Sequence, residues 1–132
     1  MSVGDSWKRA AAKYHRKFDK LRHNMLYPGG SSSAERWMPL ARYVGWHEGE
    51  LSQLCYVMNR ESSGRPEAKN PVSTASGLAQ FLAFWWDGSD GSMSHLFHSH
   101  GLPYPWNPFD AEETLKHWLV AVQHNGWSPW AL

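Results

Sequence analysis

The chain has a single cysteine, no long apolar run and almost no net charge. Cys55 is the one cysteine among 132 residues, which excludes a disulfide within the chain. No apolar run approaches the roughly 18 residues that a membrane-crossing helix needs, and no apolar stretch follows the N-terminal charges as it would in a secretory signal. We therefore expect one domain that is held together by its hydrophobic core and is made without a signal peptide.

The small net charge of +1 conceals an uneven distribution. Residues 1–27 carry seven Lys and Arg against Asp5 and Asp19, a net charge of +5, and the rest of the chain carries −4. Apolar residues recur at helical spacing among these basic residues: Trp7, Ala11, Tyr14, Phe18, Leu21 and Met25. The pattern predicts a basic amphipathic helical arm over residues 1–27, and the Pro-, Gly- and Ser-rich stretch 28–33 predicts a linker.

The predicted arm has more than one interpretation. A basic amphipathic helix can dock on its own domain or on a second subunit, or it can contact an anionic surface such as a membrane or a wall polymer. Nucleic acid is a poorer match, because the aromatic residues of 1–27 lie on the stripe that should be buried and not where bases would stack. The sequence leaves self-association and a membrane surface open.

Tryptophan is abundant, with nine in 132 residues. Aromatic side chains bury large areas, so several of them should build the core, but flat aromatic faces also line carbohydrate grooves. Trp85 falls on an expected apolar stripe, which makes Trp86 the better candidate for a groove.

Residues 34–132 have the pattern of a small, mainly helical domain with at most a short β-hairpin. We expect weak helix over 34–45, a helix over 48–61, loops or a hairpin over 62–76, a helix from Ser76 through Trp85, irregular chain over 92–109, and a helix capped by Asp110 and stopped by Asn125-Gly126.

One carboxylate stands out on the helix predicted over 48–61. Leu51, Leu54 and Met58 form its apolar stripe, and Glu61 is the next position on that stripe. Burial of a charged carboxylate is unfavourable, and a carboxyl that keeps its proton near neutral pH can act as a general acid. The alternative is that the helix has already ended and leaves Glu61 in solvent, and the spacing alone does not decide between the two.

Three segments carry a resemblance to a known family. Glu61-Ser62 is followed by Ala75-Ser76-Gly77-Leu78-Ala79-Gln80, and Asn107-Pro108 precedes the last predicted helix. In this order they resemble the lysozyme-like lytic transglycosylase family, also called soluble-lytic-transglycosylase-type or goose-type-lysozyme-like. The resemblance covers about residues 37–130. The family's later Ala-Tyr-Asn motif has a loose counterpart in His124-Asn125, where a histidine stands in place of the tyrosine.

The resemblance implies an α+β lysozyme-like catalytic domain over residues 34–132, with a cleft, that cuts the MurNAc-GlcNAc β-1,4 bond of peptidoglycan without a metal or other cofactor. It implies that Glu61 protonates the leaving oxygen and then acts as a base. Activation of water makes the protein a lysozyme, and activation of the sugar's own 6-hydroxyl makes it a lytic transglycosylase. A second acid would favour water, and Asp87 and Asp90 are the candidates, although each precedes a glycine in a common turn pair.

The same resemblance implies a substrate-binding set around Glu61. Gly77 would let the backbone approach a sugar, Gln80 would offer an amide donor and acceptor, and Asn70 would orient Glu61 or hold an acetamido group. Ser62 and the groove candidate Trp86 complete the set. Each polar member has a structural alternative: a turn residue for Asn70, a solvent-facing helix residue for Gln80, and helix-terminating hydrogen bonds for Ser62.

The sequence has other possible interpretations besides a peptidoglycan-cleaving enzyme. His95, His98 and His100 fall within six residues, but their spacing is not that of a helical metal-binding motif. A non-catalytic lysozyme-like module that binds glycan or builds a virion is the alternative function. A cell-wall target without a signal peptide would fit a bacteriophage endolysin released from the host cytoplasm, or a virion protein that docks through residues 1–27. The target bacterium and the oligomeric state are not encoded in any motif.

Overall fold

The computed structural model describes residues 34–132. The arm predicted over residues 1–27 and the linker predicted over 28–33 lie outside these described residues. In the part of the chain that is described, no helix combines the length and the apolar character needed to cross a membrane.

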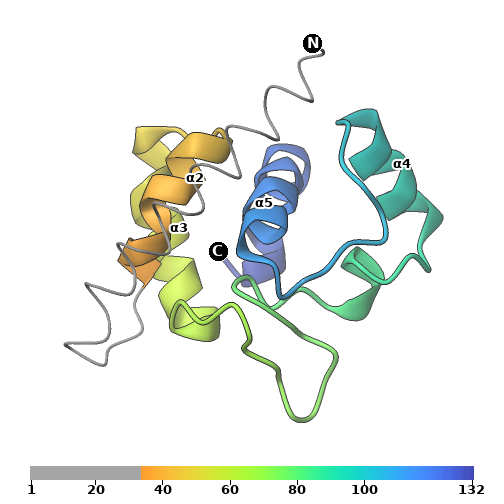
Figure 1. The fold of residues 1–132 in the computed structure, drawn as a ribbon, viewed down its shortest axis with the longest axis horizontal. Coiled ribbons are helices and arrows are strands. Elements are labelled where there is room, and N and C mark those ends of the chain that lie inside the picture. The colour runs from red at the N-terminus through yellow and green to blue at the C-terminus, as the bar shows by residue number, and fades with distance from the viewer. Residues whose placement is uncertain (1–33) are drawn as a thin grey trace. The chain divides into compact units, whose positions relative to one another are not determined.

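Residues 34–132 are mainly helical, which confirms the predicted class (Figure 1). The only β-structure in this part of the chain consists of isolated antiparallel bridges, Lys69 with Ser76 and Ser76 with Phe81. The elements in chain order are η1 (Ala34–Trp37), α2 (Met38–Val44), α3 (Glu48–Ser62), η2 (Ala83–Trp85), α4 (Gly91–Ser99), α5 (Ala111–Asn125) and η3 (Ser128–Trp130), where η denotes a 3-10 helix.

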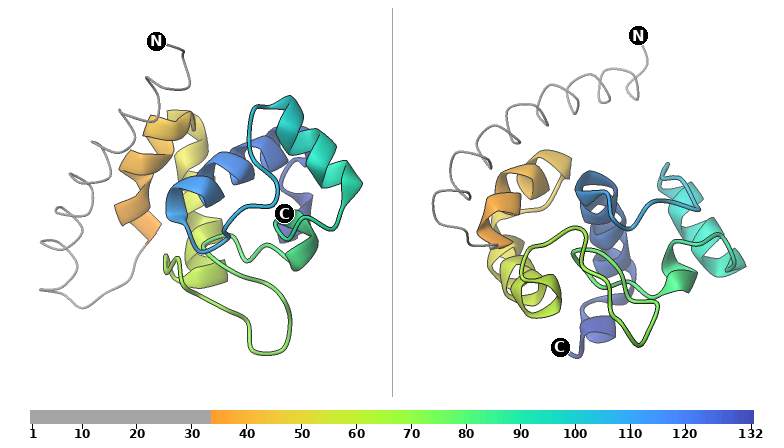
Figure 2. Two further views of the ribbon diagram at one scale, coloured as in Figure 1. Left: turned by 45° about the vertical axis from the view of Figure 1, so that its right-hand side comes forward. Right: turned by 60° about the horizontal axis from the view of Figure 1, so that its bottom comes forward.

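Helix α5 is the central element of the domain. It lies between the α2–α3 pair on one side and α4 on the other in every view (Figures 1 and 2). The indole of Trp118 on α5 is fully buried, and the rings of Trp46 and Trp130 lie 6.1 and 5.5 Å from it. Six of the eight tryptophans in residues 34–132 are buried, so tryptophan serves mainly to build the core.

The ends of α3 and α5 follow the sequence signals. Asp110 caps α5, because its Oδ1 accepts a hydrogen bond of 2.9 Å from the Glu113 amide. Gly126 stops the same helix with a φ of +66°. Helix α3 ends at Ser62 and therefore includes Glu61, and the residue that caps it, Ser63, has a left-handed φ of +54°.

The helix predicted from Ser76 through Trp85 was wrong. Ser76 and Phe81 form a β-bridge around a turn over residues 77–80, and only η2 is helical in this stretch. The backbone of Gly77 and Gln80 has φ of +80° and +55°, which no right-handed helix allows. Leu78, Phe81 and Trp85 of the predicted apolar stripe are buried without such a helix, but Leu82 is exposed.

The irregular chain predicted over 92–109 was wrong in its first part, which α4 occupies, and is confirmed after Ser99. Asp90 caps this helix: its Oδ1 accepts hydrogen bonds from the amides of Ser92 and Met93 at 2.8 and 3.1 Å. Leu96 and Phe97 are buried beneath it. The signal was present in the cap and in the spacing of these apolar residues, but Gly, Ser and His in so short a helix obscured it.

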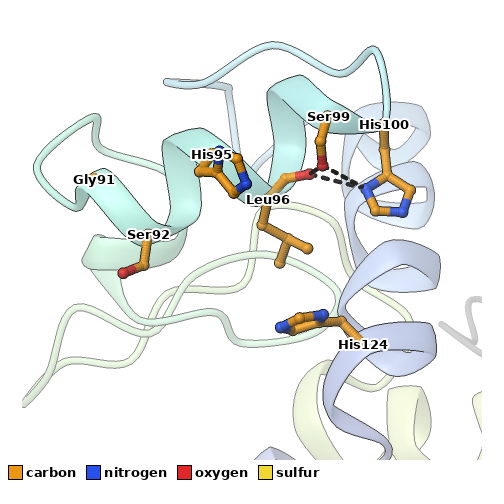
Figure 3. Close-up of a pocket in the computed structure, with 7 residues that line it drawn as sticks. All are labelled: Gly91, Ser92, His95, Leu96, Ser99, His100 and His124. Carbon is orange, nitrogen blue, oxygen red and sulfur yellow. Dashed lines mark hydrogen bonds between the residues drawn. The ribbon is translucent and has the colours of Figure 1, made fainter.

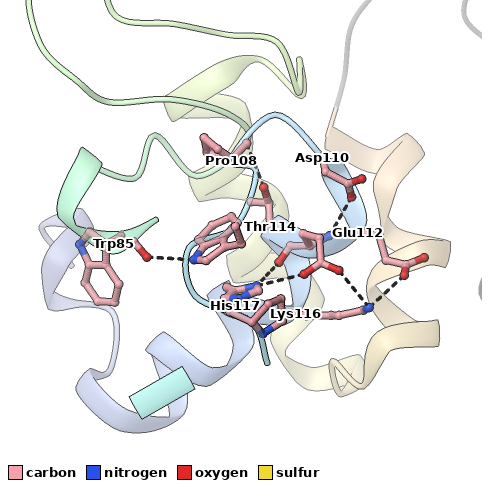
Figure 4. Close-up of polar contacts among 10 residues, drawn as sticks. Trp85, Pro108, Asp110, Glu112, Thr114, Lys116 and His117 are labelled. Carbon is pink, nitrogen blue, oxygen red and sulfur yellow. Dashed lines mark hydrogen bonds and ion pairs between the residues drawn. The ribbon is translucent and has the colours of Figure 1, made fainter. Parts of the chain in front are cut away.

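A buried histidine of α5 lies in the middle of the polar contacts drawn in Figure 4. The ring of His117 is fully buried and stacks on the ring of Trp106 at 4.1 Å. Its Nδ1 lies 2.6 Å from the Glu113 carbonyl oxygen, and its Nε2 lies 2.9 Å from the Pro103 carbonyl oxygen. Burial lowers the pKa of His117, and the two carbonyls and the carboxylate of Glu113 oppose that effect in part.

The free energy of unfolding should therefore depend on the protonation of His117. An unfolded histidine binds its proton near pH 6.5, whereas the folded His117 resists it, so its stabilisation is complete above about pH 6.5 and is lost as the pH falls toward the lower folded-state pKa. Urea unfolding between pH 8 and pH 5 should show this loss, and His117→Gln should show a smaller one. His98→Gln, which changes an exposed histidine of α4, is the matched control. Equal pH dependence in the wild type and His117→Gln would contradict the prediction.

Candidate functional site

Glu61 lies in the last turn of α3 with its side chain 27% exposed. It is therefore neither enclosed in the core nor out in bulk solvent, and the alternative that the helix ends before it does not hold. Its Oε1 accepts a hydrogen bond of 3.2 Å from Nη2 of Arg60. A carboxyl in such a setting can meet a ligand while part of its surface stays shielded from water.

The end of α3 is tied to the turn over residues 77–80. The hydroxyl of Ser62 is buried and lies 2.8 Å from the Leu78 carbonyl, to which it donates a hydrogen bond, and 3.1 Å from the Met58 carbonyl. The indole N–H of Trp130 donates to the carbonyl of Ala79 at 2.9 Å. The first of these contacts ties Ser62, the residue after Glu61, to the turn that carries Gln80.

Gly77 packs this turn against Asn107-Pro108, the third of the three segments that carry the resemblance. A Cβ added to Gly77 would lie 1.9 Å from the carbonyl oxygen of Pro108, and its φ of +80° disfavours any other residue. The requirement for glycine thus comes from close packing against the chain's own backbone. In this way the segments around Glu61, Gly77 and Pro108 meet at one place.

Gln80 presents a hydrogen-bond acceptor. Its Nε2 donates to the carbonyls of Ala68 and Gly77 at 3.1 and 3.0 Å. Its Oε1 has no hydrogen bond to any residue in 34–132 and is not a buried atom. The donor half of the amide holds the turn, and the acceptor half is left for a ligand.

Two other residues of the predicted binding set have structural partners instead. Ser62 is only 4% exposed and serves as the link between α3 and the turn. The side chain of Asn70 accepts a hydrogen bond of 2.9 Å from the amide of Val72, which is the Asx turn expected before a proline. Ser62 and Asn70 thus both help to hold the loop.

Trp86 is half-buried, and its indole N–H donates to the Phe81 carbonyl at 3.0 Å. This bond anchors the ring beside the same turn, and the ring keeps partial exposure. It stays a candidate for contact with a sugar.

Neither aspartate proposed as a second acid is free for that role. Asp90 is the cap of α4, as described above. Asp87 Oδ1 accepts a hydrogen bond of 2.9 Å from the Ser89 amide, and the hydrogen bonds from Ser89 lower the pKa of Asp87. Both carboxylates are therefore accounted for by local turns, and the site has Glu61 as its one assigned acid.

A separate pocket lies between α4 and the last turn of α5 (Figure 3). His124 lies across from Leu96 there, and His100 Nδ1 is 2.9 Å from the Leu96 carbonyl. Its lining residues are Gly91, Ser92, His95, Leu96, Ser99, His100 and His124. Sequence analysis missed this pocket because it did not predict α4. The lining has no carboxylate to serve as a general acid, so we place the candidate active site at Glu61.

The histidines of this pocket do not form a metal centre with other residues. Within the described range 34–132, no group of three His, Cys, Asp or Glu side chains is placed to hold a metal ion. The imidazole nitrogens and serine hydroxyls of the pocket can instead donate and accept hydrogen bonds.

Neither a protein-family model, nor a curated protein, nor a solved structure matches the chain. The functional argument therefore depends on the residues around Glu61 and on their chemistry.

Proposed function

We propose that the protein cleaves the MurNAc-GlcNAc β-1,4 bond of peptidoglycan, with Glu61 as the general acid and then the general base. The observation that carries this proposal is the convergence of three segments that resemble the lysozyme-like lytic transglycosylases. Ser62 is hydrogen-bonded to Leu78, and Gly77 packs against Pro108. These two contacts join the three segments that carry Glu61, Gln80 and Asn107-Pro108, which supports the proposal.

The chemistry needs only one protein carboxyl. Protonated Glu61 gives its proton to the glycosidic oxygen, and the bond from that oxygen to the MurNAc C1 breaks with its electron pair leaving on the oxygen. The substrate's N-acetyl oxygen stabilises the positive charge that develops at C1. Glu61, now a carboxylate, takes a proton from an attacking hydroxyl while that hydroxyl's oxygen bonds to C1. The attacking hydroxyl is the 6-hydroxyl of MurNAc in a lytic transglycosylase and a water in a lysozyme.

Gln80 and Trp86 are suited to hold the sugar. The Gln80 Oε1 can accept a hydrogen bond from an acetamido N–H or a sugar hydroxyl, because its own Nε2 is already bonded to Ala68 and Gly77. The backbone of Gln80 is held at a φ of +55°, which is unusual for a residue other than glycine and is retained by these hydrogen bonds. Trp86 would supply a flat apolar face.

Mass spectrometry of the muropeptides released from purified peptidoglycan tests this function directly. We expect soluble disaccharide-peptides, and their reducing ends distinguish the two products, because the 1,6-anhydro form is one water lighter. Peptidoglycans with different stem peptides should be tested, since no motif of the sequence identifies the target bacterium. Release of no fragments by folded protein would overturn the enzyme, and binding to sacculi without cleavage would favour the non-catalytic module.

We also propose that a bacteriophage delivers the protein, as an endolysin or as a virion part that opens the wall. This proposal comes from the cell-wall target of the proposed enzyme, since a bacteriophage must open the wall to enter its host or to leave it. Detection in purified particles would support the virion role, and presence only in the lysing host would support the endolysin.

A further inference from the structure

The pocket between α4 and the last turn of α5 is built mainly by one face of α4 (Figure 3). Four of its lining residues lie on the same side of that helix, at the spacing i, i+3, i+4 and i+7: Ser92, His95, Leu96 and Ser99. His100, which caps the end of α4, and His124 of α5 complete the polar lining. The pocket has a volume of about 540 Å³, which is within the range of sites that bind small molecules.

The hydrogen bonds at the end of α4 leave polar atoms of the pocket open to a ligand. The Leu96 carbonyl oxygen can only accept, and it lies 2.9 Å from Nδ1 of His100, so Nδ1 carries the proton. In the neutral ring Nε2 of His100 is then an acceptor. The Ser99 hydroxyl donates to the same carbonyl at 2.8 Å, which leaves its oxygen as an acceptor. The rings of His95 and His124 have no hydrogen bond to another residue of 34–132, so their nitrogens are available as well.

The chemical character of this lining favours a neutral ligand that is rich in hydroxyl groups. The lining contains no Asp, Glu, Lys or Arg, so no permanent charge is present to hold an ion. As described above for residues 34–132, the histidines are not grouped to hold a metal ion. Imidazole and hydroxyl groups donate and accept hydrogen bonds, as sugar hydroxyls do, and Leu96 adds an apolar surface for the C–H face of a sugar ring.

We propose that this pocket is a second glycan-binding site, which holds a sugar of the peptidoglycan strand away from the bond that is cut. The identity of the sugar, an N-acetylated amino sugar, rests on the proposed function. Its acetamido group adds an N–H donor and a carbonyl acceptor to its hydroxyls, and these match the imidazole nitrogens of the pocket. The lining shares no residue with the site around Glu61, so the pocket strengthens binding to a strand without taking part in cleavage. Two contacts with one polymer bind it more tightly than either contact alone, because the second contact is intramolecular.

The test follows the histidine rings by NMR while the full chain with Glu61→Gln is titrated with the β-1,4-linked tetramer of N-acetylglucosamine. The substitution removes the proposed acid, so the sugar stays intact during the titration. We expect the ring signals of the three pocket histidines to move and to saturate as the tetramer is added: His95, His100 and His124. His98 is the internal control, because it is an exposed histidine of the same helix that does not line the pocket.

A pair of variants in the same Glu61→Gln chain tests the assignment of the pocket. His124→Ala should weaken the binding that the His95 and His100 signals report by about 3–10-fold, the effect expected for the loss of one hydrogen bond. His98→Ala should leave this binding unchanged. Both replaced side chains are exposed, so both variants should fold, which circular dichroism checks. If His124→Ala does not fold, His95→Ala takes its place, with the His100 and His124 signals as the readout.

The result for the pocket can be separated from the result for the enzyme. Pocket histidines that do not respond to the tetramer, or equal binding by folded His124→Ala, would overturn the second site even if the wild type releases muropeptides. Conversely, an inactive wild type whose pocket histidines respond would refute the glycosidase and leave a glycan-binding module. Signals that move with inorganic phosphate or with Zn²⁺ alone, and not with the tetramer, would identify an ion site and would also overturn the proposal.

Discussion

Replacing Glu61 with Gln is expected to lower the rate of muropeptide release by at least about 10²–10⁴-fold, because the proposed mechanism has no other acid. The amide cannot donate a proton to the glycosidic oxygen, and it cannot afterwards accept one from the attacking hydroxyl. Its carbonyl oxygen can still accept the hydrogen bond from Arg60. The side chain is partly exposed, so the free energy of unfolding should change by only about 0.5 kcal/mol.

The measurement is the rate of release of soluble fragments from purified peptidoglycan, with thermal unfolding monitored in parallel. Glu67→Gln is the matched control, since it neutralises an exposed carboxylate of the following loop and should retain wild-type activity. Retained binding to sacculi by Glu61→Gln would show that recognition survives without chemistry. Wild-type rates in Glu61→Gln would sink the proposed mechanism.

Replacing Gly77 with Ala should destabilise the domain by about 3 kcal/mol or more. The new Cβ would lie 1.9 Å from the Pro108 carbonyl oxygen, at a φ of +80° that disfavours an L side chain. Neither backbone can move away freely. The Gly77 amide donates to the Ala68 carbonyl at 2.8 Å, and the buried Thr114 hydroxyl donates to the Pro108 carbonyl at 3.0 Å (Figure 4).

Urea or thermal unfolding measures the effect, and Gly49→Ala is its control. Gly49 lies in α3, and an added Cβ there has no atom within 4 Å. Because alanine is the better helix former, Gly49→Ala should raise the free energy of unfolding by about 0.5–1 kcal/mol. The same class of substitution should thus have opposite signs at the two positions. Wild-type stability in Gly77→Ala would be inconsistent with the packing of this turn on Pro108.

Gly77→Ala should also lower the enzymatic activity, for a structural reason. A shift of Pro108 away from residue 77 would separate two of the three segments that converge near Glu61. We therefore expect loss of muropeptide release even at temperatures where the variant stays folded, whereas Gly49→Ala should keep its activity.

The contrast between α5 and the 76–85 stretch shows where prediction from sequence succeeds. Helix α5 was predicted because Asp110, Gly126 and the apolar stripe between them all act through neighbours a few residues away. The 76–85 stretch had an equally helical pattern of apolar residues. Its conformation depends instead on hydrogen bonds to Ala68 and on packing against Pro108, and these tertiary contacts override local preference.

The same distinction between local signals and tertiary contacts applies to the candidate site. The sequence by itself determined the mainly helical class and the tryptophan-rich core, and it singled out Glu61 near the end of α3. Only the tertiary structure decided that Ser62 ties α3 to the 77–80 turn, that Gln80 offers an acceptor, and that Arg60 links Glu61 to η3. Caps and stripes are local, but these roles arise from partners as far as 16 and 70 residues apart along the chain, which meet only when the core closes.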